Sequence, residues 1–216
     1  MSRGRFIVFE GGEGAGKSTQ ARLLADALRA RGIDALQTRE PGGTPGAEAI
    51  RQLLLDPPGP KSLGDWPASA EALLFAAARA DHVARAIRPA LEAGRWVISD
   101  RFLDSSRAYQ GGGGGVADSD LRELHRIGSN ALVPDLTLLL EASEDEVAAR
   151  LARRVGDQMD AIEGRGVHYH SQVAVAFRRF AQEEPDRFAC IDASGAPEST
   201  HQAIMQALEP LLGRDR

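Results

Sequence analysis

The sequence has few cysteines, few lysines and no excess of positive charge, and each shortage excludes a class of protein. With one cysteine, Cys190, among 216 residues, the chain can build neither an internal disulfide framework nor a zinc site of several thiolates. We therefore expect a reducing cytoplasm as its compartment and a place for Cys190 in the core. Only Lys17 and Lys61 of the 26 basic residues are lysines, so a lysine inside a motif carries more weight than an arginine.

Long apolar segments are missing as well. Runs such as Leu136–Leu140 fall far short of the roughly 20 residues needed to cross a bilayer, and the apolar segment Phe6–Phe9 is too short for a signal peptide. The 31 acidic residues outnumber the 26 basic ones, so no global basic field can hold nucleic acid or an anionic membrane. We expect no nucleic-acid partner and no membrane partner, and only local recognition of phosphate.

Hydrophobic runs alternate with helical patterns along the whole chain, which predicts a single α/β domain over residues 1–216 with a mostly parallel sheet. The expected strands span Arg5–Glu10, Asp34–Arg39, Trp96–Asp100, Leu136–Leu140 and Phe188–Asp192. The expected helices span Lys17–Arg31, Ala47–Leu55, Ser69–Ala93, Ser119–Ser129, Ser143–Arg154, Gly166–Glu183 and Glu198–Leu212. Prolines over 56–67 and five consecutive glycines, Gly111–Gly115, predict two mobile loops.

The first expected strand leads directly into a phosphate-binding pattern, G-x-x-x-x-G-K-[ST]. Its residues are Gly11, Gly12, Glu13, Gly14, Ala15, Gly16, Lys17 and Ser18, and Thr19 continues it into a helix. Glycines allow successive N–H groups to point inward as an anion nest, and the helix adds its N-terminal dipole. Lys17 supplies a charge for the β- and γ-phosphates, and the hydroxyl of Ser18 is a Mg²⁺ ligand. The alternative is a glycine-rich turn that only joins strand to helix.

A second candidate lies at the end of the strand Trp96–Asp100, which closes in a carboxylate. Folds of this kind place such an aspartate beside the metal and the attacking group. Arg101 at the same strand end suits an anionic substrate, although a surface ion pair with Asp100 or Asp104 is its simpler alternative.

Phe75 and Arg79 stand four residues apart in an expected helix and hence on one face. An aromatic plane with a fork of donors is what a flat, hydrogen-bonding base needs. From spacing alone, however, an ordinary core Phe75 with Arg79 at the rim is the simpler interpretation.

Together these motifs resemble those of bacterial thymidylate kinases in order and spacing, over nearly the whole chain from Phe6 to about Ala193. The motifs that carry the resemblance are the phosphate loop, Arg39–Thr44, Leu74–Arg79, Ser99–Phe102 and Asp104–Gly111. The resemblance implies a three-layer P-loop NTPase fold, an α/β fold with a five-stranded parallel sheet flanked by helices. It also implies transfer of the ATP γ-phosphoryl group to thymidine monophosphate with Mg²⁺, in a homodimer.

The resemblance also implies a role for each matching residue. Phe75 would stack on thymine and Arg79 would hydrogen-bond its edge, while Arg101 would clamp the acceptor phosphate. Asp100 would lie beside Mg²⁺ and the acceptor. The remaining acceptor-site residues would be Glu13 near the sugar 3′-hydroxyl, Tyr109 where a 2′-hydroxyl would clash, Ser106 and Gln110 along the base and phosphate, Arg39, and Pro41 in a tight turn below the acceptor.

Two arginines of the family pattern are absent. The lid, about residues 150–165, commonly contains D-R-[IF]-E, where this chain has Ala161 in place of arginine, and Gly114 replaces the arginine of Q-G-x-G-R-G. Because Gly14 is not basic either, the resemblance implies that the lid supplies the transition-state cation.

The candidates for this cation are Arg153 and Arg154, with Arg165 in reserve, and solvated surface positions for all three are the alternative. Two other functions stay open. One is a kinase of another nucleoside monophosphate, which Phe75, Arg79 and Tyr109 disfavour. The other is a nucleotide-binding module with impaired turnover, which the intact phosphate loop disfavours.

Overall fold

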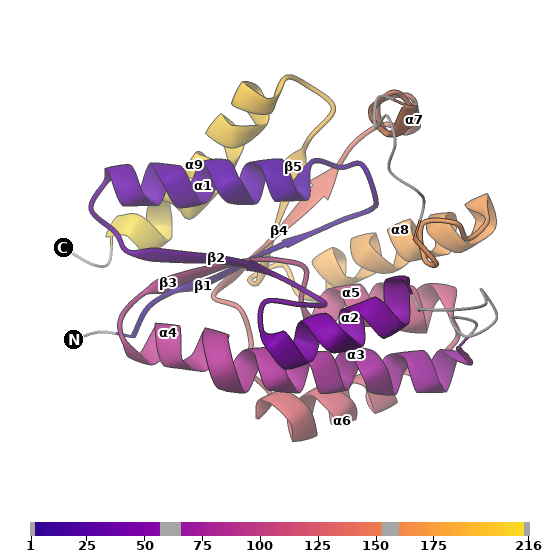
Figure 1. Cartoon of the computed structure of the whole chain (residues 1–216). Coiled ribbons are helices and arrows are strands. Elements are labelled where there is room, and N and C mark those ends of the chain that lie inside the picture. Colours follow the sequence, from indigo (N-terminus) through magenta and orange to yellow (C-terminus); the bar gives the residue numbers. More distant parts are fainter. Residues whose placement is uncertain (1–2, 57–65, 153–159, 214–216) are drawn as a thin grey trace.

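The computed structural model describes residues 3–56, 66–152 and 160–213, and a five-stranded parallel sheet lies at its centre (Figure 1). The strands are β1 (Phe6–Glu10), β2 (Ala35–Arg39), β3 (Trp96–Asp100), β4 (Leu136–Glu141) and β5 (Phe188–Asp192). Their order across the sheet is β2-β3-β1-β4-β5, and every neighbouring pair is parallel. Each expected strand is confirmed, with ends that differ by no more than one residue.

The expected helices are present in the described residues, but the helical turns over residues 103–113 were not predicted. The helical elements of the described part are α1 (Lys17–Ala30), α2 (Pro45–Leu55), α3 (Ala68–His82), η2 (Val83–Ile87), α4 (Arg88–Glu92), α5 (Leu103–Ser106), η3 (Arg107–Gly113), α6 (Asp118–Ser129), α7 (Glu144–Ala152), α8 (Val167–Glu183) and α9 (Pro197–Leu212). The helix expected over 69–93 is a continuous run of α3, the π-helical turn η2 and α4. Pro89 has no N–H for the carbonyl four residues earlier, and Arg88 bonds instead to the carbonyl of Val83. None of these helices combines the length and the hydropathy that crossing a membrane requires.

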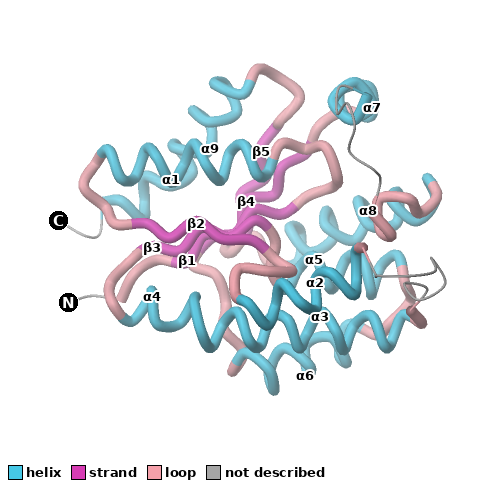
Figure 2. Tube along the Cα trace, viewed as in Figure 1, coloured by secondary structure: helices cyan, strands magenta, loops and turns pink. Residues whose placement is uncertain are grey.

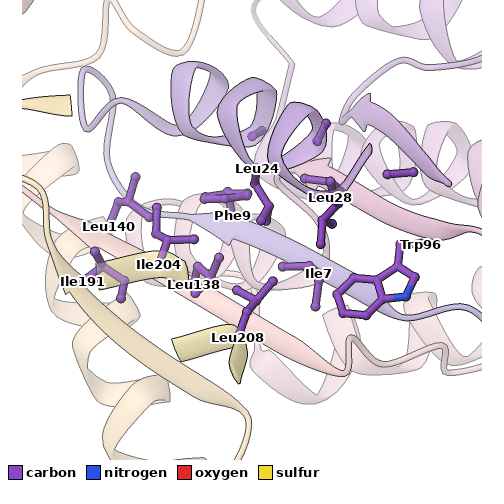
Figure 3. Packing of buried hydrophobic residues seen from close by; sticks show 14 of the residues in the cluster. Ile7, Phe9, Leu24, Leu28, Trp96, Leu138, Leu140, Ile191, Ile204 and Leu208 are labelled. Carbon is purple, nitrogen blue, oxygen red and sulfur yellow. The ribbon is translucent and has the colours of Figure 1, made fainter. Parts of the chain in front are cut away.

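The helices cover the sheet on both faces and so complete three layers (Figure 2). Helices α1 and α9 lie together on one face, where Ile7 and Phe9 of β1 pack with Leu24 of α1 (Figure 3). The alternate residues Phe6 and Val8 point to the opposite face, into a cluster with residues of η2 and α4. Because β1 is the central strand and is buried on both faces, its carboxyl end has a fixed position between the carboxyl ends of β3 and β4.

The glycine run was predicted to be a mobile loop, and this prediction is wrong for its first half. Gly111–Gly113 complete the π-helical element η3. Helix α8 packs directly against this backbone: a Cβ on Gly112 would lie 2.7 Å from the Cβ of Ala176. Tertiary packing therefore orders a segment whose composition indicates a loop. Of the other predicted loop, residues 57–65 lie outside the described residues.

The prediction for Cys190 is also wrong. Its side chain is exposed on β5, which is an edge strand of the sheet. An edge strand has one unpaired side, so its alternate residues reach solvent more readily than those of the central strands.

The first two glycines of the phosphate loop provide a test of this packing. Gly11 has φ +133°, and a Cβ there would overlap the carbonyl oxygen of Leu140 in the neighbouring strand. We expect Gly11→Ala to destabilise the protein by at least about 2 kcal/mol in urea unfolding. Gly12→Ala is the matched control, since nothing lies within 4 Å of its added Cβ. Equal stability of the two variants would contradict this account.

Candidate active site

The carboxyl ends of β1, β2 and β3 open into a cavity of about 490 Å³. At this end of the sheet the connection that leaves β1 runs to β2 on one side, whereas the connection that leaves β3 runs to β4 on the other side. The crevice between two such connections is the usual ligand position in open parallel sheets. The predicted site residues that line it are Glu13, Gly14, Gly16, Lys17, Ser18, Thr19, Arg39, Pro41, Phe75, Arg79, Asp100, Arg101, Ser106, Tyr109 and Gln110. Gly11, Gly12 and Ala15 do not line it, and Arg153 and Arg154 lie outside the described residues.

The phosphate loop ends at Gly16, whose left-handed backbone (φ 94°) turns the chain into α1. Lys17 is the first residue of that helix, and its Nζ donates to the carbonyl oxygen of Gly12 at 2.7 Å. Burial, followed by the positive charge of Arg101, lowers the pKa of Lys17. An anion in the loop would therefore relieve an unfavourable electrostatic environment.

Ser18 and Asp100 both line the cavity and meet there, although they are far apart in sequence. The Ser18 hydroxyl donates to Oδ2 of Asp100 at 2.5 Å. The other oxygen, Oδ1, is buried and has no hydrogen-bond partner among the described residues. A hydroxyl beside a carboxylate with an unused oxygen is a donor set that suits Mg²⁺. The predicted metal ligands thus fit the ion.

Arg101 is the most connected side chain of the site. Its backbone is left-handed, with φ 73°, and its guanidinium forms an ion pair with Glu13. It also donates to the carbonyl of Gly11 at 3.1 Å, to Ser105 Oγ at 3.0 Å and to Tyr109 Oη at 3.1 Å. Burial opposes its charge, but the acidic groups led by Glu13 outweigh burial and raise the pKa of Arg101. Its carboxylate partner is Glu13 and not Asp100 or Asp104.

Behind this arginine lies Glu10, which the sequence analysis did not select. The carboxylate is completely buried and accepts from the N–H of Phe102 at 2.9 Å and from the N–H and Oγ of Ser105 at 3.0 and 2.5 Å. Burial, reinforced by the charge of Asp104, raises the pKa of Glu10 from 4.5 to about 7. Its position as the last residue of β1, directly before the phosphate loop, is the sequence signal that could have found it.

One face of α3 forms a wall of the cavity. Phe75 and Arg79 line the cavity, and Glu71, four residues before Phe75, lies on the same side of the helix without lining the cavity. Arg79 is only 3% exposed, so the interpretation as a rim residue is wrong. Its Nε donates to Glu40 at 2.7 Å, and its Nη2 donates to the Phe102 carbonyl and to Ser106 Oγ, both at 3.0 Å.

An ion pair with Glu40 stabilises the buried guanidinium of Arg79. This buried carboxylate binds Arg79 through one oxygen and His82 Nδ1, at 3.1 Å, through the other. His82 in turn contacts Thr38 Oγ1 at 2.7 Å. Burial works against ionisation of Glu40, but Arg79 and His82 outweigh it and lower its pKa. Neither Glu40 nor His82 was selected from the sequence, because their role depends on burial beside a distant partner.

In the lid, Asp160, Ile162 and Glu163 of the described stretch 160–165 close one side of the cavity. Arg165 forms an ion pair with Glu71 and donates to Tyr169 Oη at 2.8 Å. Its guanidinium is thus engaged away from the phosphate loop, which weakens its case as the reserve lid cation.

A second hollow of about 580 Å³ lies beyond the phosphate loop. Ala15, Gly16 and Thr19 line one side of it, and residues 193–197 between β5 and α9 line the other. Arg150 of α7 reaches into it and donates to the carbonyl of Gly14 at 3.3 Å and to that of Ala193 at 2.7 Å. The sequence alone gave no indication of this hollow.

Known proteins resemble this chain in both sequence and fold. Residues 9–204 match the family model of thymidylate kinase. The chain is 56% identical over 209 residues to a thymidylate kinase of Rhizorhabdus wittichii, which covers 97% of this chain and 99% of the relative. It is 50% identical over 207 residues to a thymidylate kinase of Rhodopseudomonas palustris strain TIE-1, and this match covers 95% of this chain and 89% of the relative. The crystal structure of thymidylate kinase from Ehrlichia chaffeensis superposes with a TM-score of 0.73 at 29% identity, covering 96% of this chain and 100% of that one.

The raised pKa of Glu10 predicts a dependence of stability on pH. The folded state holds this proton up to about pH 7, whereas the unfolded chain releases it near 4.5, so stability falls as pH rises between these values. Glu10→Gln stays neutral and keeps an acceptor for both N–H groups. We expect the unfolding free energy of the wild type to fall by about 3 kcal/mol relative to this variant between pH 4 and pH 8. Urea unfolding at both pH values measures it, and a constant difference would refute it.

Proposed function

The chain belongs to the thymidylate kinase family, and from this premise we propose that it transfers the γ-phosphoryl group of ATP to thymidine monophosphate. The observation that carries the proposal is a single cavity that joins an anion-binding loop to an aromatic wall with hydrogen-bonding groups. The reaction would take place in the bacterial cytoplasm, where both nucleotides are present.

Thymine would lie against the face of Phe75. The Nη1 of Arg79 has no partner among the described residues, so it is the donor that this wall offers to the base edge. Ser106 holds the other end of the same guanidinium and keeps it in plane. A base that carries an acceptor on this edge is the ligand that such a wall favours.

The acceptor phosphate would bind Arg101 and Arg39 above the turn at Pro41. In the structure Arg101 is paired with Glu13, and an arriving phosphate competes for the same guanidinium. Glu13 is then able to accept from the sugar 3′-hydroxyl. Tyr109, whose hydroxyl is held between Glu13 at 3.0 Å and Arg101 at 3.1 Å, would fill the space that a 2′-hydroxyl requires.

The donor phosphates would occupy the nest of N–H groups formed by the phosphate loop, with Lys17 at the β- and γ-positions. Ser18 and Asp100 would hold Mg²⁺, which neutralises charge on the transferred group. The adenosine part would extend into the second hollow, between the end of the phosphate loop and residues 193–197. Both nucleotides then approach from opposite sides of the loop, which suits in-line transfer by positioning and charge neutralisation.

A coupled ADP-release assay tests the acceptor. We expect dTMP to be used with a kcat/KM at least about tenfold above that of UMP, because Tyr109 excludes the 2′-hydroxyl and the base site accepts the thymine methyl. Lys17→Met serves as the inactive control for the phosphate loop. Equal use of dTMP and UMP, or a preference for a purine monophosphate, would refute the proposed acceptor.

The transition-state cation would come from Arg153 or Arg154, since Arg165 forms an ion pair with Glu71 and the residue at position 161 is alanine. An arginine finger is worth about 10³ or more in kcat. A module with impaired turnover is the competing outcome, suggested by the absent arginines at Ala161 and Gly114.

Alanine variants of Arg153 and Arg154 test the lid. We expect one of them to lower kcat by at least about tenfold with little change in the KM for dTMP, since the contact forms in the transition state. Ala161→Arg should raise kcat if the site lacks charge. Arg22→Ala on the exposed side of α1 is the control for loss of an arginine. Unchanged kcat in all lid variants would place the cation elsewhere.

We further propose that two copies associate through α3 and α6. These helices pack against each other, yet Leu73 of α3 is 57% exposed and Ile127 of α6 is 66% exposed. Exposed large apolar side chains on adjacent helices are typical of a protein interface.

Light scattering tests this association. The wild type should have twice the 23.1 kDa mass of one chain, and Ile127→Asp should shift it toward a monomer by burying a charge. Val175→Asp on α8 is the matched control, since Val175 is 61% exposed on another helix. A monomeric wild type, or equal effects of both changes, would refute the interface.

A further inference from the structure

A buried carboxylate stands behind the base wall and has no role in the account so far. Glu71 of α3 is 3% exposed and does not line the cavity. Its Oε1 accepts from Nε2 of Gln110 at 2.7 Å and from Nη1 of Arg165 at 3.3 Å, and its Oε2 pairs with Nη2 of the same guanidinium. Gln110 itself is 1% exposed and lines the cavity.

The chemistry of this contact decides which end of the Gln110 amide faces the ligand. A carboxylate paired with a guanidinium offers acceptors only, so the amide must direct its NH₂ group toward Glu71. The amide oxygen Oε1 is left for the cavity, and no described residue donates to it. The cavity wall then presents a donor from Arg79 and an acceptor from Gln110.

We propose that Glu71 is a specificity-determining positioning residue, which orients the amide of Gln110 so that its oxygen accepts from the N3–H of thymine. This inference rests on the proposed function. A donor beside an acceptor matches O4 and N3–H of thymine and opposes cytosine, which has an amino group at position 4 and an unprotonated N3. Arg165 holds Glu71 in place but does not select the orientation of the amide.

Replacement of Glu71 by glutamine separates these roles. In Glu71→Gln the new oxygen takes the position of Oε2, because Arg165 makes its closer contact there through Nη2 and a guanidinium only donates. The new NH₂ group then faces Gln110, and the Gln110 amide must rotate to offer its oxygen. Its own NH₂ group turns into the cavity, where it opposes N3–H of thymine and matches N3 of cytosine.

Steady-state kinetics with dTMP and 5-methyl-dCMP provide the test, since the two share the methyl group and differ in the hydrogen-bonding edge. We expect Glu71→Gln to lower the ratio of kcat/KM for dTMP over 5-methyl-dCMP by about tenfold or more. Arg165→Met is the matched control: it breaks the same ion pair but leaves an acceptor-only carboxylate, so the ratio should stay within about twofold of the wild type. A purely structural role for Glu71 would lower both substrates together.

An unchanged ratio in Glu71→Gln, or an equal fall in Arg165→Met, would overturn the inference while the wild type still phosphorylates dTMP. A wild type inactive with dTMP would instead refute the proposed function. The wild type also supplies a test that needs no variant, because 3-methyl-dTMP lacks the N3 proton. Its kcat/KM should be lower than that of dTMP by a factor of about ten or more. Equal use of the two would overturn the inference even if Glu71→Gln does not fold.

Discussion

The site depends on where the guanidinium of Arg101 lies. A left-handed turn at the end of β3 directs this side chain across the sheet edge, where it pairs with Glu13 and donates to Gly11, Ser105 and Tyr109. One cation thereby connects α5 and η3, which follow it directly in the sequence, to the phosphate loop about 90 residues earlier. A buried charge is stable only when it is paired, so these segments keep their positions as long as Arg101 does.

Behind the cavity, buried carboxylates orient the side chains that face the ligand. Glu10 accepts a hydrogen bond from the hydroxyl of Ser105, which in turn accepts one from Arg101. Glu40 accepts a hydrogen bond from Nε of Arg79. Glu71 acts in the same way on Gln110. A carboxylate paired with a guanidinium, as Glu40 and Glu71 are, accepts and does not donate, and therefore each of these two selects a single arrangement of its partner. The surface that meets the nucleotides is set by acidic groups that do not themselves touch the base.

The fold and the phosphate loop could be predicted because their signals are local. Alternation of apolar runs specifies the strands, and the spacing of Gly11 to Ser18 specifies the loop. The roles of the buried carboxylates could not be predicted, because each depends on a distant partner. The role of Glu71, for example, depends on Gln110, which lies 39 residues away. Composition also misled where packing decides the structure, as in the glycine run against α8. The signals for the base wall were the interval of four between Phe75 and Arg79 and the family resemblance over Leu74–Arg79.

The most direct measurement is a crystal structure of the protein with dTMP bound. The account predicts thymine against Phe75, with N3 within hydrogen-bonding distance of Gln110 Oε1 and the phosphate on Arg101 in place of Glu13. Thymidine monophosphate in the hollow beyond the phosphate loop, or a phosphate bound with the Arg101–Glu13 pair intact, would contradict it.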